Sequence, residues 1–153
     1  MLLSLQIPEL VLGDNAALGL PDHLQRLKIE RPLIVTDQGL VRAGHAARLI
    51  ESFGRDKAPT CFDATRENPT ADCVDRATRI FIENACDGVV ALGGGSVIDT
   101  AKLTAVTATH GGRASEYPDI PRDKLTLHRS APCDLRSFLH KNASASAHCS
   151  HGT

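Results

Sequence analysis

The stretch that decides the fold is ALGGGSVIDTAK, residues 91–102. An apolar segment, GVVAL at 88–92, precedes three glycines, and a pattern typical of a helix follows over 96–108. The start of a helix offers unpaired N–H groups and a partial positive charge, so an anion binds there readily. Glycines let the backbone turn sharply and let a bulky pyrophosphate approach the main chain. The stretch therefore predicts a phosphate-binding turn between a buried strand and a helix.

The same residues have alternative interpretations that need no ligand. Ser96 can cap the helix or donate to a phosphate oxygen, and Ser96-x-x-Asp99 is a capping box by itself. Asp99 and Lys102 can form a surface pair at i, i+3, or Lys102 can bend toward a ligand. The glycines can also form an ordinary loop. The pattern is neither the Rossmann G-x-G-x-x-G motif nor the P-loop motif.

Outward from this stretch, strand-like and helix-like segments alternate. A turn cluster is predicted at 13–15 and a polar loop at 63–69. Gly54 should end one helix, and Thr70 should begin the next as its N-cap. The predicted strands are 9–12, 32–36, 60–62 and 88–92, and the predicted helices are 21–28, 40–53, 70–84 and 96–108. This alternation predicts an α/β fold with a doubly wound, Rossmann-like parallel sheet and helices on both faces. Asp37 and the glycine loop follow strands, so they should share the rim at the carboxyl ends of the sheet.

Composition excludes several classes of protein. Hydrophobic residues make up 42% of the 153 residues and aromatics only 3%, which suits a core of small branched side chains. The formal net charge of −1 gives no field that favours nucleic acid. The five cysteines match neither a zinc ribbon nor a disulfide framework, and no apolar run approaches the roughly 20 residues of a membrane helix. We expect a cytoplasmic protein with idle thiols, without a membrane span or signal peptide.

The character of the chain changes near Arg113. The alternation stops, and residues 141–153, KNASASAHCSHGT, are small and polar. The glycine stretch and the alternating segments around it predict a dinucleotide-binding domain over 1–112. Composition predicts an irregular or disordered tail over 113–153, and from Asp119 onward the sequence resembles the product of a shifted reading frame. His148, Cys149 and His151 in this tail follow no metal-ligand pattern that we can assign.

The motif GGGSVIDTAK resembles the signature of iron-dependent (group III) alcohol dehydrogenases, a superfamily that also holds glycerol dehydrogenases and dehydroquinate synthases. Three further segments are similar to that family and occur in the same order: IVTD with Gly39-Leu40, Asn68-Pro69-Thr70, and Cys86-Asp87-Gly88. The resemblance covers roughly residues 5–112.

The resemblance implies a role for each matching residue. Asp37 would accept hydrogen bonds from the adenosine ribose and favour NAD over NADP, although it can also be only a turn-forming residue. Asn68 would line the cofactor site or merely cap a loop. Gly94, Gly95 and Ser96 would hold the pyrophosphate. Beside the nicotinamide end would lie two residues of the helix, Asp99 and Lys102.

Family members continue into a helical domain whose Asp and three His bind Fe²⁺ or Zn²⁺, and no such ligand set is recognisable here. The resemblance thus implies an NAD-dependent alcohol dehydrogenase truncated to its NAD-binding domain, with an alcohol or aldehyde substrate in full-length members. We assign no catalytic or metal-binding residue and expect no catalysis by the chain alone. The alternatives are a non-catalytic dinucleotide-binding module, a non-functional gene fragment, or a relative of glycerol dehydrogenase. An exposed face that would pack on the helical domain should favour self-association.

Overall fold

A parallel sheet forms the centre of the molecule. In the computed structural model, the described residues are 11–54 and 57–117. The strands are β1 (Pro32–Asp37), β2 (Thr60–Thr65) and β3 (Gly88–Ala91). They form a three-stranded sheet in the order β2-β1-β3, and both pairings are parallel. The prediction of a parallel α/β sheet is confirmed.

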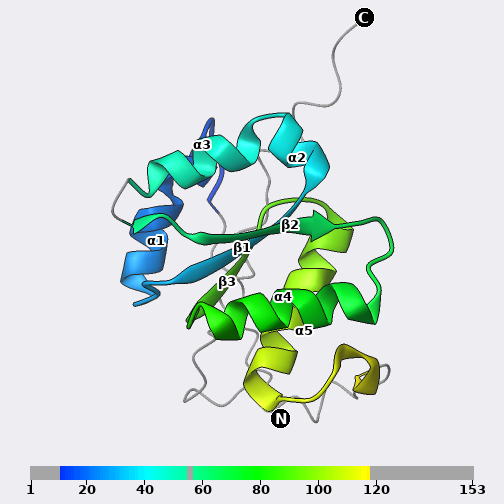
Figure 1. Ribbon diagram of the computed structural model, residues 1–153. Coiled ribbons are helices and arrows are strands. Elements are labelled where there is room, and N and C mark those ends of the chain that lie inside the picture. Colours follow the sequence, from blue (N-terminus) through cyan, green and yellow to red (C-terminus); the bar gives the residue numbers. More distant parts are fainter. Residues whose placement is uncertain (1–10, 55–56, 118–153) are drawn as a thin grey trace, which may run out of the picture.

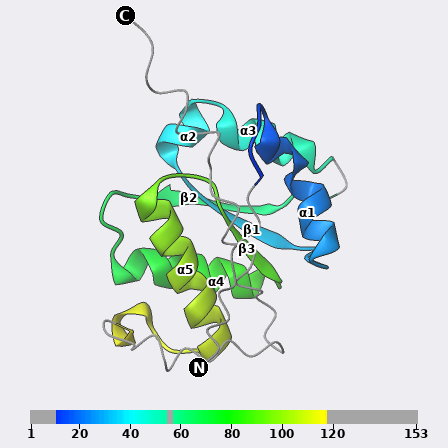
Figure 2. The same cartoon turned by 180° about the vertical axis from the view of Figure 1, so that it is seen from behind.

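Helices cover both faces of this sheet (Figure 1). On one face lie α1 (Leu20–Arg26) and α3 (His45–Ser52), and on the other lie α4 (Ala71–Glu83) and α5 (Gly95–His110). The view from behind shows the same two layers (Figure 2). Shorter elements connect them: η1 (Ala16–Gly19), α2 (Gln38–Arg42) and η3 (Ala114–Glu116). The predicted doubly wound arrangement is therefore also confirmed.

The central strand is buried on both faces because its side chains alternate between two cores. Leu33 and Val35 pack into the cluster under α4 and α5, whereas Ile34 packs into the cluster under α1 and α3. All three side chains are fully buried. Successive side chains of a strand point to opposite faces, so a strand covered on both sides must be apolar throughout. This is why the run PLIVT forms the middle of the sheet.

The predicted helix over 40–53 is wrong in one respect, because it is two helices. α2 ends at Arg42 and α3 begins at His45. Between them Gly44 has φ of 79°, in the left-handed region. A right-handed helix cannot continue through that conformation, which glycine adopts readily. The apolar residues of 40–53 keep a roughly helical spacing across Gly44, so the pattern gave no sign of this break.

Two other segment boundaries also differ from the prediction. The loop predicted over 63–69 begins later, because β2 extends to Thr65 and pairs with Asp37 of β1. The strand predicted over 9–12 is wrong for its described part. Val11 and Leu12 are in no strand and Leu12 is 67% exposed, whereas residues 9 and 10 lie outside the described part. A short apolar run forms a strand only where a neighbouring strand pairs with it.

α4 begins at a capping threonine, and its first half contacts the η3 segment. Thr70 caps the helix by accepting a hydrogen bond from Cys73 N–H, as predicted. Near the other end of the described chain, Arg113 Nε donates to Asp75 Oδ2 at 3.3 Å, and Ala114 N donates to Asp75 Oδ1 at 2.8 Å. Residues 113–117 thus belong to the packed structure, and the rest of the tail lies outside the described residues. The division at residue 112 stays a prediction.

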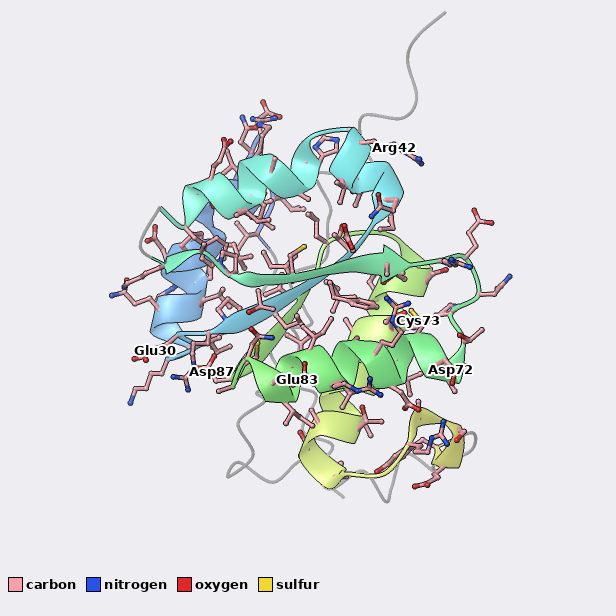
Figure 3. All side chains as sticks on the ribbon, viewed as in Figure 1. Glu30, Arg42, Asp72, Cys73, Glu83 and Asp87 are labelled. Carbon is pink, nitrogen blue, oxygen red and sulfur yellow. The ribbon has the colours of Figure 1, made fainter. Side chains whose placement is uncertain are left out.

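Asp87 ties the amino end of the sheet together. Its carboxylate accepts hydrogen bonds from Glu30 N at 2.9 Å and from Arg31 N at 2.8 Å, which join the segments before β1 and β3. Figure 3 shows Asp87 beside Glu30 at this edge. We expect Asp87→Ala to lower the free energy of unfolding by about 1–3 kcal/mol, because two amide donors lose their acceptor.

Urea denaturation of the Asp87→Ala variant tests this expectation. Glu83→Ala is the matched control, because Glu83 is exposed at the end of α4 and its side chain has no hydrogen bond or ion pair within the described residues. An equal, small effect of both substitutions would contradict the role assigned to Asp87.

Candidate cofactor-binding site

The glycine turn joins β3 to α5 and leaves the start of that helix open. Gly94 is the N-cap residue, and no side chain caps the helix. The first bond after the turn runs from Ile98 N to Gly94 O at 3.0 Å. A Cβ atom built on Gly94 or Gly95 meets no atom within 4 Å, so the backbone here borders open space. Uncapped N–H groups beside open space form an arrangement that can accept an anion.

The capping function considered for Ser96 is wrong. α5 begins one residue earlier, at Gly95, so Ser96 is the second residue of the helix rather than its N-cap. The glycine turn extends the helix backward because Gly94 adopts the extended N-cap conformation, with φ of −83° and ψ of −164°. The other function considered, donation to a phosphate oxygen, is compatible with this position.

A cavity of 460 Å³ lies at the carboxyl ends of the strands. Asp37 borders it from the end of β1, and Gly94, Gly95 and Ser96 border it from the start of α5. The other lining residues come from α2, from the end of β2 and the loop after it, and from α5: Gln38, Gly39, Arg42, Thr65, Arg66, Glu67 and Val97. The predicted shared rim of Asp37 and the glycine loop is therefore present.

Asp37 has a structural contact in addition to its place in the cavity wall. Its Oδ1 accepts a hydrogen bond from Leu40 N at 3.0 Å and so caps α2. A carboxylate can accept several hydrogen bonds through its two oxygens. Asp37 can therefore cap the turn and still offer acceptor capacity to a ligand, so the two interpretations from sequence are compatible.

Three of the residues matched by resemblance lie outside this cavity wall. Asn68 is exposed in the loop after β2 and has a left-handed backbone with φ of 52°. Asp99 and Lys102 lie further along α5, where Lys102 Nζ is 3.6 Å from Asp99 Oδ1 and both side chains are more than half exposed. The predicted i, i+3 surface pair is confirmed. The cofactor roles of these three residues stay predictions.

Sequence reasoning missed several residues of the cavity, above all those at the end of β2. Thr65 was assigned to a polar loop but ends β2, which is longer than predicted. Arg66 and Glu67 lie in the loop after β2, as predicted, and that loop also borders the cavity. Arg42 was treated only as part of a helix; Figure 3 shows it extending from α2. The signal that could have revealed the β2 residues is positional, since residues at the carboxyl end of any strand of this sheet reach the same rim.

The charges around the cavity are mixed. Arg42 and Arg66 contribute two positive charges, and Asp37 and Glu67 contribute two negative charges. In the described part of the chain, neither arginine forms an ion pair. The wall therefore combines hydrogen-bond acceptors for hydroxyl groups with cations for phosphate, which are the two kinds of group that a dinucleotide carries.

The described cysteines give no sign of a reactive centre. Cys61, Cys73 and Cys86 are free thiols, and burial raises the pKa of each above its ordinary value. Each thiol therefore holds its proton to higher pH than an exposed cysteine and is a weaker nucleophile at neutral pH. The other two cysteines, Cys133 and Cys149, lie outside the described residues.

Within residues 11–54 and 57–117, no group of three or more His, Cys, Asp or Glu side chains could hold a metal ion. The described residues thus do not fit a metal centre. In the same ranges, no helix is long and apolar enough to cross a membrane.

Comparisons with known proteins agree with this geometry. Residues 8–134 match the family described as iron-containing alcohol dehydrogenase. The 4-hydroxybutyrate dehydrogenase of Cupriavidus necator is 45% identical over 101 residues, which are 66% of this chain and 26% of that enzyme. The NAD-dependent methanol dehydrogenase of Bacillus methanolicus is 32% identical over 116 residues, 74% of this chain and 30% of that enzyme.

A solved structure is also similar to this chain over part of its length. Sulfoacetaldehyde reductase from Bifidobacterium kashiwanohense, determined in complex with NAD⁺, aligns with a TM-score of 0.68 and 30% identity, covering 76% of this chain and 31% of that one. The chain therefore spans less than a third of the length of each of these relatives. The family match over most of the chain, together with the parallel sheet and its open glycine turn, shows that this chain belongs to the iron-containing alcohol dehydrogenase family.

Proposed function

We propose that this chain is the NAD-binding part of an iron-containing alcohol dehydrogenase. The observation that carries the proposal is the cavity in which Asp37, at the end of β1, lies across from the uncapped start of α5. The family match and the NAD⁺ complex of a similar structure support the choice of dinucleotide. We assign the binding function to residues 1–112, as the sequence predicted.

In this proposal the pyrophosphate binds at Gly94, Gly95 and Ser96. The N–H groups of the first turn of α5 would donate to phosphate oxygens, and the partial positive charge of the helix start would stabilise the anion. The free space over Gly94 and Gly95 lets the phosphates reach the main chain, which a side chain would prevent. The hydroxyl of Ser96 can add one donor.

The adenosine ribose would then lie at Asp37. The carboxylate would accept hydrogen bonds from the ribose hydroxyls, whereas a 2′-phosphate would meet a negative charge. Three further residues lie outside the cavity wall, and any contact that they make with the cofactor would be beyond that wall. Asn68 would line the cofactor site there, and Asp99 and Lys102 would lie beside its nicotinamide end. Alcohol oxidation or aldehyde reduction with NAD is the activity that we propose for the protein to which this part belongs.

The substrate is proposed only as an alcohol or aldehyde. The names of similar proteins cover 4-hydroxybutyrate, methanol and sulfoacetaldehyde, so they share a reaction class and not a substrate. Membership of the family implies a bound Fe²⁺ or Zn²⁺ in the whole protein. The described residues contain no set of side chains that could bind it. We also propose a cytoplasmic location, since protonated free thiols suit a reducing compartment, and we propose that the chain self-associates.

Calorimetric titration tests the cofactor preference. The chain is expected to bind NAD⁺ more tightly than NADP⁺, because Asp37 opposes the 2′-phosphate. Asp37→Asn should reduce the ratio of NAD⁺ affinity to NADP⁺ affinity about tenfold, because the negative charge that opposes the 2′-phosphate is lost. The asparagine side chain can still cap α2, and Arg42 and Arg66 remain in the wall to attract the phosphate.

Asp22→Asn is the matched control, because it removes one negative charge from an exposed site in α1, outside the cavity wall and outside every residue assigned to the cofactor. Tighter binding of NADP⁺ than of NAD⁺ by the unmodified chain would contradict the role of Asp37. Binding of neither dinucleotide would contradict the proposed function itself.

A further inference from the structure

Thr65 is a buried polar residue in the wall of the cavity. It ends β2, it is 5% exposed, and it borders the cavity. Among the described residues, its Oγ1 is a buried side-chain oxygen without a hydrogen-bond partner. Buried polar atoms almost always have a partner, and leaving one without a partner costs free energy. An unpaired hydroxyl in the wall of a binding cavity therefore indicates that a bound ligand supplies the missing hydrogen bond.

Its position identifies the part of the cofactor within reach. Thr65 is the register partner of Asp37 in the neighbouring strand, so the two residues lie side by side at the carboxyl edge of the sheet. Paired residues of adjacent strands are separated by about 5 Å, the distance between strands. A ribose that contacts the Asp37 carboxylate is therefore adjacent to the Thr65 side chain.

We propose that Thr65 is a positioning residue for the cofactor, whose hydroxyl donates to one hydroxyl of the adenosine ribose while the Asp37 carboxylate accepts from the other. This inference rests on the proposed function. Thr65 lines the cavity, and rotation of χ1 between staggered positions exchanges the places of its hydroxyl and methyl group, so the hydroxyl can adjust to a ligand there. In the structure this buried oxygen has no partner, so a ribose hydroxyl would supply the hydrogen bond that it lacks.

The test compares threonine-to-valine substitutions at Thr65 and Thr104, the two residues of the described chain whose buried hydroxyl lacks a partner. Thr65→Val removes the hydroxyl and keeps the shape, and valine suits a strand. We expect the dissociation constant for NAD⁺ to rise about three- to tenfold, the value of one hydrogen bond, while the urea midpoint stays equal or increases. Thr65→Ser should keep most of the affinity, because the hydroxyl remains.

Thr104→Val is the control. Thr104 is fully buried on α5 with an Oγ1 that also lacks a partner among the described residues, but it does not border the cavity. Its substitution should leave the affinity for NAD⁺ unchanged. A purely structural role of Thr65 would make the two valine variants equivalent in both measurements.

Ribose analogues locate the contact. Titration with AMP, 2′-deoxy-AMP and 3′-deoxy-AMP should show that the unmodified chain loses affinity when a ribose hydroxyl is removed, and that one of these losses disappears in Thr65→Val. Equal NAD⁺ affinity of Thr65→Val and the unmodified chain would overturn the inference and leave the proposed function standing. Failure of the unmodified chain to bind NAD⁺ would instead overturn the proposed function, and the inference with it.

Discussion

Replacing Gly93 by alanine is expected to lower the free energy of unfolding by about 2–3 kcal/mol, because the added methyl group has no space. A Cβ atom at Gly93 would lie 2.5 Å from Cγ2 and 2.8 Å from Cβ of Val97. Val97 is 2% exposed and belongs to the core under α4 and α5, so its displacement would disturb core packing. Gly93 also has φ of 158°, a conformation that side chains rarely adopt.

The measurement is urea denaturation followed by circular dichroism. Combining Gly93→Ala with Val97→Ala isolates the steric conflict, because the smaller side chain makes room for the methyl group. The double variant should lose less stability than the sum of the two single losses, as expected for residues in direct contact. Strictly additive losses, or a Gly93→Ala variant as stable as the unmodified chain, would show that the turn is not held by this contact.

Replacing Gly94 by alanine should have the opposite pattern: little change in stability and a loss of NAD⁺ affinity of about tenfold or more. A Cβ atom on Gly94 meets no protein atom within 4 Å, and φ of −83° is allowed for alanine. The open space is the place that the proposal assigns to the pyrophosphate, so a methyl group there would hold the phosphates away from the N–H groups of α5.

Gly19→Ala is the matched control for this second prediction. Gly19 is also the N-cap residue of a helix, its added Cβ also meets nothing within 4 Å, and its φ is −80°. It lies outside the cavity wall, so its substitution should leave NAD⁺ binding unchanged. Equal NAD⁺ affinities of the Gly94→Ala and Gly19→Ala variants would contradict the assignment of the pyrophosphate to the glycine turn.

The sequence alone predicted those parts of the fold in which burial and chain order point to one structure. The runs PLIVT and GVVAL are apolar throughout, which a strand covered on both faces requires, and the helices between them require parallel strands. Parallel order in turn places Asp37 and the glycine turn at one edge. This part of the site could therefore be predicted without knowing any distance.

What the sequence did not predict depends on contacts between distant segments. β2 reaches Thr65 because it pairs with β1 as far as Asp37, and a polar sequence gives no sign of that pairing. For this reason Thr65 was not assigned to the site, nor were Arg66 and Glu67 in the loop that follows it. The break at Gly44 has a different cause, since a glycine within an apolar helical pattern is also compatible with an unbroken helix.

Titration of the ¹⁵N-labelled chain with NAD⁺, observed through its amide resonances, tests the central claim most directly. The proposal predicts that the largest shifts occur at Gly95, Ser96 and Val97, whose N–H groups begin α5, with smaller shifts at Asp37 and Thr65. Shifts confined to residues outside the cavity, or no shifts at NAD⁺ concentrations in the millimolar range, would contradict the claim that this turn binds the cofactor.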